Sequence, residues 1–375
     1  MGVTVTIVKQ ESDGAREKTE LSMQPLTHPI EGEPIATGSR VLIVSDAWKP
    51  QVNGVVRTLE WLAAEAPAFG VNVVMLTPER FRSIPMPTYP EIRLSLTGAS
   101  TIAAMIDEID PDAIHIATEG PLGFLARRHC LVRKRPFTTC YHTRFPEYIA
   151  ARFPIPQALI YAWLRRFHNA GSTTLVATGG LRDELASHGF SKLKTWRRGI
   201  DLNLFGKGQK INLGARGPLF LYVGRVAVEK NIEAFLSLDL PGTKIIVGEG
   251  PARQDLQKKF PSARFLGMKS GQELANIYAS ADVFVFPSRT DTFGLVMLEA
   301  LAAGTPVAAF PVTGPMEVLA GSRCGVMHED LRKAALTALE IPRDACKAFA
   351  KRHGMRESAA HFFSHVAAVR VPKRN

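Results

Sequence analysis

The sequence predicts an α/β protein built from two doubly wound domains, each with a parallel sheet between helices. The chain has 375 residues, which is more than one hydrophobic core usually supports. Short apolar, β-branched runs alternate with helix-length segments, as is typical of parallel strands that are buried on both faces. This alternation stops at residues 201–217 and then restarts, so we expect one sheet on each side of that segment.

The first domain is expected to span residues 39–200. A polar stretch precedes it, residues 1–38, which has 3 basic and 6 acidic side chains and which we expect to lack stable structure. Five apolar runs are predicted strands of this domain, namely residues 40–46, 71–77, 113–118, 136–143 and 172–178. Residues 54–69 and 99–109 are predicted helices between them.

The second domain is expected to span residues 218–345. Its linker, "DLNLFGKGQKINLGARG" at residues 201–217, has no sustained period and several glycines. The predicted strands are residues 219–224, 244–250, 263–267, 283–288 and 306–312. Residues 346–375 remain as a C-terminal segment with a helical stretch.

Cysteine usage and hydropathy indicate a cytoplasmic protein. The four cysteines have no paired spacing, which favours reduced thiols over disulfides or a metal site. The first 20 residues contain acids and no long apolar core, so we do not expect a signal peptide. No apolar stretch approaches the roughly 20 residues that a membrane-spanning helix needs.

The net charge of +11 is distributed unevenly. Residues 39–200 have a net charge of +7, residues 201–345 of +1 and residues 346–375 of +6. A basic surface attracts nucleic acid, anionic lipid or acidic substrates, although a charge excess can also serve solubility alone. Because no motif combines aromatic and basic residues for base recognition, we expect no nucleic-acid partner.

Ligands of doubly wound sheets bind beyond the carboxyl ends of the strands, so the loops there are the candidate sites. In "PQVNGVVRTLE", Gly54 opens a helix and lets an anion approach the helix N-terminus, although it could be a simple turn glycine. In "YHTRFPEY", His142 lies at a strand end, which is the position expected for a residue of the ligand cleft. The alternative is that this histidine has a purely structural role.

Two cations follow the first strand of the second domain, in "YVGRVAVEKN". Arg225 offers a planar fork and Lys230 a point charge, and phosphate oxygens accept hydrogen bonds from both. Such a pair could neutralise a diphosphate without a metal ion, so we expect no metal site. The alternative is a solvated start of a helix.

The stretch "RTDTFGLVMLEALAAG" places one acid in a loop and a second in the helix that follows. Asp291 and Glu299 could accept hydrogen bonds from sugar and ribose hydroxyls. Gly294 leaves the helix-start amides free for an anion. The helix dipole would explain Asp291 alone, but it gives no reason for the whole pattern.

These motifs resemble retaining glycosyltransferases of the GT-B fold that use nucleotide-diphosphate sugars, the family 4-like group. The matching segments are "NGVVRTL", "YHTRFPEY", "VGRVAVEKN", "VGEGP", "FLG" and "FPSRTDTFGLVMLEALAAGTPVAA", which lie between residue 40 and about residue 365. The resemblance implies two Rossmann-like domains that face a central cleft. It also implies a C-terminal helix, residues 356–369, that crosses back to the first domain, so residues 346–375 are expected to lie together with that domain.

For the donor phosphates and the transferred sugar, the resemblance implies specific contacts. Gly54 would line the donor phosphates, and His142 would contact the sugar near the reacting carbon. Arg225 and Lys230 would bind the diphosphate and stabilise its departure. The donor would be a substrate, and no separate cofactor is expected.

For the sugar hydroxyls and the ribose, the implied contacts come from the loop and helix of the second domain. Asp291 would bind sugar hydroxyls, and Glu299 would bind the ribose. The backbone of Phe293, Gly294 and Leu295 would face sugar and phosphate. The family usually has glutamate where this chain has Asp291, a departure that concerns the identity of the hexose.

The wider sequence resembles bacterial enzymes that glycosylate diacylglycerol or related lipids, which implies a UDP-hexose or UDP-hexuronate donor. It also resembles α-mannosyltransferases that use GDP-mannose. Basic and apolar residues are mixed in residues 126–135 and 158–168, so we expect the first domain and the basic tail to rest on the inner face of an anionic membrane. For residues 158–168, an ordinary core helix with charged ends is the alternative. A nucleotide-sugar epimerase and a non-catalytic basic binding protein are the remaining alternatives.

Overall fold

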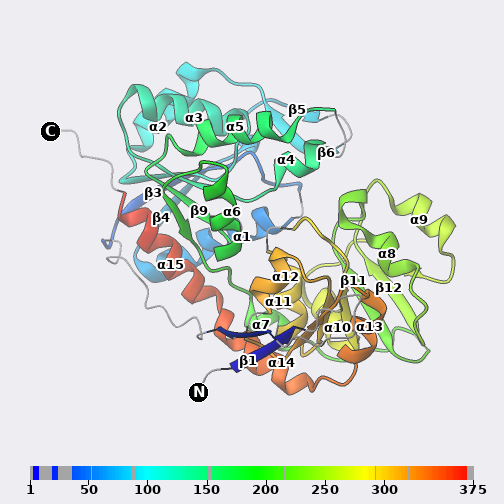
Figure 1. The fold of residues 1–375 in the computed structure, drawn as a ribbon. Helices are drawn as coiled ribbons and strands as arrows, with labels where there is room; N and C mark the ends of the chain where they lie inside the picture. The colour runs from blue at the N-terminus through cyan, green and yellow to red at the C-terminus, as the bar shows by residue number, and fades with distance from the viewer. Residues whose placement is uncertain are drawn as a thin grey trace.

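The computed structural model consists of two α/β lobes, each built on a six-stranded parallel sheet (Figure 1). It describes residues 3–7, 19–23, 36–51, 53–86, 89–150, 154–214, 216–291, 293–319 and 321–369. The two parallel sheets confirm the predicted fold class.

The sheet of the first lobe has the strand order β10-β9-β8-β7-β3-β4. Its strands are β3 (Arg40–Val44), β4 (Asn72–Leu76), β7 (Ala113–Ile116), β8 (Thr138–Tyr141), β9 (Thr173–Val176) and β10 (Leu193–Thr195). Its helices are α1 (Gly54–Glu65), η1 (Ala66–Phe69), η2 (Pro78–Arg80), α2 (Ala99–Ile109), α3 (Pro121–Val132), α4 (Phe145–Ala150), α5 (Gln157–His168) and α6 (Gly179–Ser187). The chain reverses its direction of strand addition between β3 and β7, which makes this the switch point of the sheet.

The sheet of the second lobe has the strand order β13-β12-β11-β14-β15-β16, with its switch point between β11 and β14. Its strands are β11 (Leu219–Val223), β12 (Thr243–Val247), β13 (Arg264–Phe265), β14 (Val283–Phe286), β15 (Val307–Ala309) and β16 (Gly325–Met327). Its helices are α7 (Leu202–Phe205), η3 (Val228–Lys230), α8 (Ile232–Leu236), α9 (Arg253–Lys259), α10 (Gly271–Ser280), α11 (Leu295–Ala302), α12 (Thr313–Val318), α13 (Leu331–Ala338) and α14 (Arg343–Ala350).

Both faces of each sheet are covered, which explains the continuous apolar runs of the strands. Successive side chains of a strand point to opposite faces. In β3, Val41 and Ile43 pack into a core with residues of α1, whereas Leu42 and Val44 pack into a core with residues of α2 and α3. Strand β11 divides its side chains between two cores of the second lobe in the same way.

The last helix returns to the first lobe, as predicted. After η4 (Lys351–His353), helix α15 (Met355–Ala367) runs along the first lobe (red in Figure 1). Phe362 and Phe363 are buried in the core that also contains Trp196. The indole nitrogen of Trp196 donates to the carbonyl of Ser358 at 3.0 Å.

The basic C-terminal segment is divided between the lobes, which differs from the prediction that residues 346–375 lie together with the first domain. Helix α14 packs against α11, and both Cys346 and Ala350 are buried in the core of the second lobe. Only α15 reaches the first lobe, and residues 370–375 lie outside the described residues. Apolar side chains at one face of α14 therefore decide its position, irrespective of the charges nearby.

Several short elements were not expected. Within residues 1–38, β1 (Val3–Ile7) pairs antiparallel with β2 (Thr19–Met23), and the alternation of valine and threonine in β1 favours a strand. Strands β5 (Ser83–Met86) and β6 (Tyr89–Ser95) pair antiparallel beside the first sheet. The predicted helix at residues 54–69 changes to the tighter helix η1 at Ala66, since Pro67 has no backbone N–H for a continued α-helix.

Candidate active site

The carboxyl ends of the two sheets meet at helix α1 of the first lobe and helix α11 of the second. Gly54 is the first residue of α1, and the side chain of Asn53 caps this helix by accepting hydrogen bonds from two of its amides, each at 3.0 Å. A Cβ atom at Gly54 would lie 3.5 Å from the Cδ1 atom of Leu295, the first residue of α11. The structure thus brings together two of the predicted donor-binding positions from opposite lobes.

The predicted cations both follow β11, close to the switch point of the second sheet. Lys230 ends helix η3, and its ammonium group forms an ion pair with the Asp291 carboxylate. Both side chains are mostly buried, with exposed fractions of 19% and 17%. Arg225 lies just after the strand, where the Tyr222 hydroxyl donates to its carbonyl at 2.9 Å. Lys230 and Asp291 were predicted as separate site residues, and the structure shows that their side chains form an ion pair.

The glycine between the two acids has a specific steric reason. Gly294 has a φ of +86°, and a Cβ atom there would lie 2.8 Å from the Met297 methyl carbon and 2.9 Å from the Phe286 ring. Phe293 packs against the core beside it. This backbone conformation turns the chain from the Asp291 loop into α11 within three residues.

Glu299 lies in α11 and has an exposed side-chain fraction of only 4%. One carboxylate oxygen accepts a hydrogen bond from Arg57 of the first lobe at 2.8 Å. The other accepts a hydrogen bond from the Tyr278 hydroxyl, also at 2.8 Å. Burial, followed by the charge of Glu299, raises the pKa of Tyr278 well above its usual range, so this hydroxyl remains a donor.

A second carboxylate of the second lobe also binds the first lobe. Glu317, in α12, accepts a hydrogen bond from the amide of Gly180 at 2.6 Å. Gly180 lies in the first turn of α6, where amides have no partner within the helix. Arg57, Tyr278 and Glu317 were not predicted as site residues, because their partners lie on other elements and no local spacing identifies them.

His142 follows β8 of the first lobe, as predicted, but its hydrogen-bond partner was not expected. Its Nδ1 atom lies 3.3 Å from the guanidinium of Arg198, which also contacts the Cys140 sulfur at 3.4 Å. The guanidinium stacks over the Trp196 ring at 3.8 Å. Burial, followed by the charge of Arg198, lowers the pKa of His142 well below its ordinary value, so its imidazole is neutral.

A buried contact between a histidine and a carboxylate lies near His142 in the first lobe. The Nε2 atom of His168 lies 2.9 Å from a Glu119 oxygen, and its Nδ1 atom lies 2.9 Å from the Thr139 hydroxyl. Asp46 accepts hydrogen bonds from the amides of Leu122 and Gly123 at the start of α3. The carboxyl edge of the first sheet therefore contains several buried polar and acidic side chains.

Buried His115 predicts a specific dependence of stability on pH. Burial, followed by the charge of Arg198, lowers the pKa of its imidazole to about 3, whereas an unfolded chain has a histidine pKa of about 6.5. Only the unfolded chain takes up this proton between the two values, so the contribution to stability is complete above pH 6.5 and is lost as pH falls. The loss is about 1.4 kcal/mol per pH unit.

We therefore expect the His115→Gln variant to show a shallower pH dependence than the wild type. Urea unfolding from pH 6 to pH 4 should give a slope of unfolding free energy against pH that is lower by about 1.4 kcal/mol per unit in the variant. The comparison removes contributions common to both proteins, including that of Asp46, whose pKa is raised by burial. Equal slopes in the two proteins would contradict the assignment.

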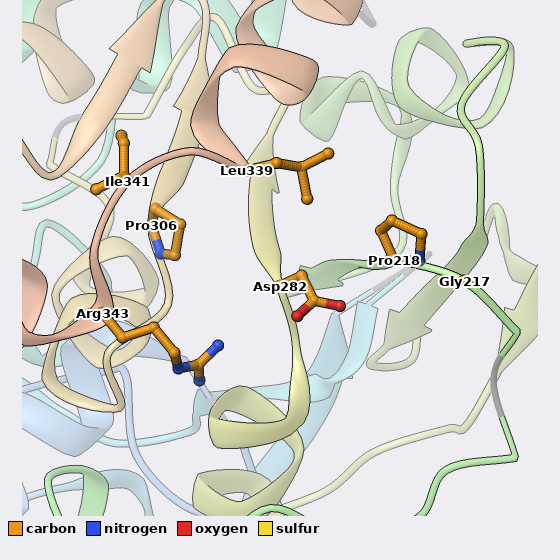
Figure 2. A pocket seen from close by; sticks show the side chains of 7 residues that line it. All are labelled: Gly217, Pro218, Asp282, Pro306, Leu339, Ile341 and Arg343. Carbon is orange, nitrogen blue, oxygen red and sulfur yellow. The ribbon is translucent and has the colours of Figure 1, made fainter.

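A separate cavity of about 460 Å³ lies on the opposite edge of the second sheet (Figure 2). Pro218, Asp282 and Pro306 line it, and each directly precedes a strand. Its charged side chains already have backbone partners, since Asp282 accepts from the Leu219 amide and Arg343 donates to the carbonyl of Ala281. Because the predicted site residues follow the strands, this cavity is not part of their site.

Known protein families match both lobes in sequence. Residues 52–204 match the family described as Glycosyltransferase Family 4, and residues 217–341 match the family described as Glycosyl transferases group 1. The first match ends at residue 204 and the second begins at residue 217, and both positions lie within the predicted interdomain linker, residues 201–217.

Several curated proteins are similar over most of the chain. Sulfoquinovosyl transferase SQD2 of Arabidopsis thaliana is 30% identical over 84% of this chain and 66% of its own length. A GDP-mannose-dependent alpha-mannosyltransferase of Mycobacterium tuberculosis is 28% identical over 77% of this chain and 84% of its own. An alpha-monoglucosyldiacylglycerol synthase of Streptococcus pneumoniae is 26% identical over 80% and 78%. All three names describe transfer or attachment of a sugar.

The fold also matches solved structures. The structure of Anabaena HepE in complex with UDP and glucose aligns with a TM-score of 0.65 and 17% sequence identity, over 88% of this chain and 100% of that chain. At this identity the likeness concerns the fold. Together with the two family matches and the named relatives, it establishes that the chain belongs to the family 4-like glycosyltransferases of the GT-B fold, enzymes that use sugar-nucleotide donors.

Proposed function

We propose that this glycosyltransferase moves a hexosyl unit, glucosyl, glucuronosyl or galactosyl, from a UDP-sugar to a membrane lipid such as diacylglycerol, with retention of the anomeric configuration. The main observation in support of a lipid acceptor is an exposed apolar and basic surface on the first lobe. One relative is named as a monoglucosyldiacylglycerol synthase, which supports the same acceptor class.

The exposed surface is formed by helix α5 and the residue segment before it. Leu159 and Trp163 lie one helical turn apart, with exposed fractions of 63% and 47%, and Ile155 is 44% exposed. Arg165 and Arg166 are exposed at the end of the same helix. An exposed tryptophan and leucine beside arginines match the composition of helices that lie in a membrane interface. Among the described residues, no helix has the length and apolar character of a membrane span.

The proposed mechanism uses fixed protein charges at the diphosphate. Arg225 and Lys230 stabilise the negative charge that develops on the leaving phosphate, and no metal ion or other cofactor is required. Asp291 holds sugar hydroxyls, Glu299 holds the ribose, and Gly54 with the backbone of residues 293–295 lines the phosphates and sugar. His142, neutral at physiological pH, contacts the sugar near the reacting carbon.

The acceptor hydroxyl attacks the anomeric carbon from the face that the phosphate leaves. The bond from that carbon to the phosphate oxygen breaks while the bond to the acceptor oxygen forms. The departing phosphate takes the proton of the acceptor hydroxyl, so no carboxylate is needed as a covalent nucleophile. The contribution of the protein is orientation of the two substrates and electrostatic stabilisation.

The second candidate is a GDP-mannose-dependent α-mannosyltransferase acting on a lipid or glycan, which the relative of that name favours. A direct assay distinguishes the candidates. Purified protein is incubated with labelled UDP-glucose, UDP-galactose, UDP-glucuronate or GDP-mannose and a total lipid extract. We expect label in the lipid phase with a UDP-sugar. Label from GDP-mannose alone would establish the second candidate, and an interconverted sugar nucleotide without an acceptor product would indicate an epimerase.

Binding to anionic vesicles tests the proposed membrane surface. At low salt the protein should sediment with phosphatidylglycerol-containing liposomes, and a double variant, Leu159→Ser with Trp163→Ser, should bind at least several-fold more weakly because it loses apolar burial in the interface. Ile211→Ser removes an exposed apolar side chain elsewhere and is the matched control. Absence of wild-type binding, or equal binding of the double variant, would rule out this surface.

A further inference from the structure

We propose that Arg57 positions the Glu299 carboxylate for the donor and thereby couples sugar-nucleotide binding to the apposition of the two lobes. This inference rests on the proposed function, in which Glu299 binds the ribose of the donor. Arg57 acts through Glu299 and is a positioning residue.

The geometry places this contact between the predicted donor-binding segments. Arg57 lies one turn into α1, three residues after Gly54, and Glu299 lies in the second turn of α11. The two residues are 242 positions apart in the sequence, and their side chains meet at 2.8 Å. Arg57 is 35% exposed, whereas Glu299 is 4% exposed. The contact therefore joins a partly solvated cation of one lobe to a buried anion of the other.

In the present arrangement Glu299 depends on this contact more than Arg57 does, because its carboxylate is buried whereas the guanidinium is partly solvated. A buried carboxylate that loses its cation retains an uncompensated charge, which is strongly unfavourable. Without Arg57, the neutral hydroxyl of Tyr278 is the hydrogen-bond donor that remains on Glu299 among the described residues. The carboxylate is thus held in its present orientation when α1 lies against α11.

The same arrangement leaves Glu299 able to bind a ribose. Each carboxylate oxygen can accept about two hydrogen bonds. Arg57 uses one site on one oxygen, and Tyr278 uses one site on the other. The remaining site on each oxygen suits the two adjacent hydroxyls of a ribose. Arg57 and the nucleotide can therefore bind Glu299 at the same time, and the arginine fixes the plane of the carboxylate before the nucleotide arrives.

Nucleotide affinity in a double-mutant cycle tests this inference. Arg57→Gln, Glu299→Gln and the double variant are titrated by calorimetry with UDP-glucose and with GDP-mannose. Glu60→Gln is the matched control, because Glu60 lies on the same helix in an exposed pair with Lys49. Arg57→Lys keeps the charge without the rigid fork, and thermal unfolding of every variant verifies that it is folded.

We expect Arg57→Gln to weaken the binding of the nucleotide on the order of 10-fold or more, as for loss of a charged hydrogen-bond partner of a buried carboxylate. Arg57→Lys should give a smaller loss, and Glu60→Gln should change affinity less than twofold. In the Glu299→Gln background, Arg57→Gln should have little further effect on nucleotide affinity, because the carboxylate through which Arg57 acts is already absent.

Either of two results would overturn this inference and leave the proposed function intact. One is binding by Arg57→Gln within twofold of the wild type. The other is a full additional loss of affinity from Arg57→Gln in the Glu299→Gln background. The second result would mean that the arginine acts independently of Glu299. Failure of the wild type to bind either nucleotide would overturn the proposed function itself, and this inference with it.

Discussion

Replacing Lys230 with alanine is expected to lower kcat on the order of 100-fold or more, by analogy with the loss of one preorganised donor that stabilises transition-state charge. Lys230 ends η3 just after the switch-point strand β11, and its ammonium group is held by Asp291. Because the lysine is mostly buried, water cannot replace its charge efficiently. The effect should appear in kcat rather than only in the KM of the donor, since the diphosphate charge develops as the bond breaks.

A matched control separates this effect from a general loss of positive charge. Lys259 is in an ion pair with Glu233, and both side chains are more than half exposed. Lys259→Ala should therefore leave kcat unchanged, as surface pairs contribute little. Turnover of Lys230→Ala close to that of the wild type, in a protein with normal thermal unfolding, would refute the role of Lys230.

Replacing Asp291 with alanine is expected to lower kcat/KM of the donor roughly 100-fold, because hydrogen bonds to a charged group contribute about 1.5–3 kcal/mol each and more than one is lost. The Asp291 carboxylate is proposed to hold sugar hydroxyls while it also fixes the Lys230 ammonium group. Its removal therefore disturbs both the sugar and the cation beside the diphosphate. Steady-state kinetics with the preferred donor measures the loss.

The glutamate that the family usually has at this position provides the informative second variant. Asp291→Glu keeps the charge and adds one methylene, so we expect activity to be retained within about 10-fold, with a changed ranking of hexoses. Glu329→Gln, at an exposed pair with Arg289, is the control for a nearby surface acid and should have no effect. Wild-type kinetics in Asp291→Ala would exclude this carboxylate from the donor site.

Where a strand is apolar on both faces, the sequence was sufficient to predict it. The runs that begin at Arg40 and Leu219 became β3 and β11, with alternate side chains in two different cores. The helix predicted at residues 99–109 has the observed bounds. Strands β10 and β16 were missed, because each is a three-residue edge strand with no fully buried residue to produce an apolar run.

The candidate-site residues that could be predicted are those that follow a strand within a recognisable local sequence pattern. Gly54 and Leu295 were expected in one donor site, and in the structure a Cβ atom at Gly54 would lie 3.5 Å from Leu295 Cδ1. The partners across the lobes could not be predicted in this way. The pairing of Arg57 with Glu299 spans 242 residues and depends on how the two sheets face each other, which no local period encodes.

The position of α14 is set by apolar contacts that its sequence alone does not locate. The family resemblance implied that the whole C-terminal segment would join the basic first lobe. Burial of Cys346 and Ala350 in the second lobe fixed the helix there, because apolar burial contributes more than long-range attraction between solvated charges. Only the following helix, α15, makes the crossing.

The central claim is that the lobes close over a sugar nucleotide and that Arg225 and Lys230 stabilise its diphosphate. A crystal structure with UDP-glucose or GDP-mannose, whichever the protein binds, measures this directly. We predict phosphate oxygens within hydrogen-bond distance of Arg225 and Lys230, with a ribose hydroxyl on Glu299. Diphosphate bound elsewhere, or bridged to the protein by a metal ion in place of these two side chains, would contradict the claim.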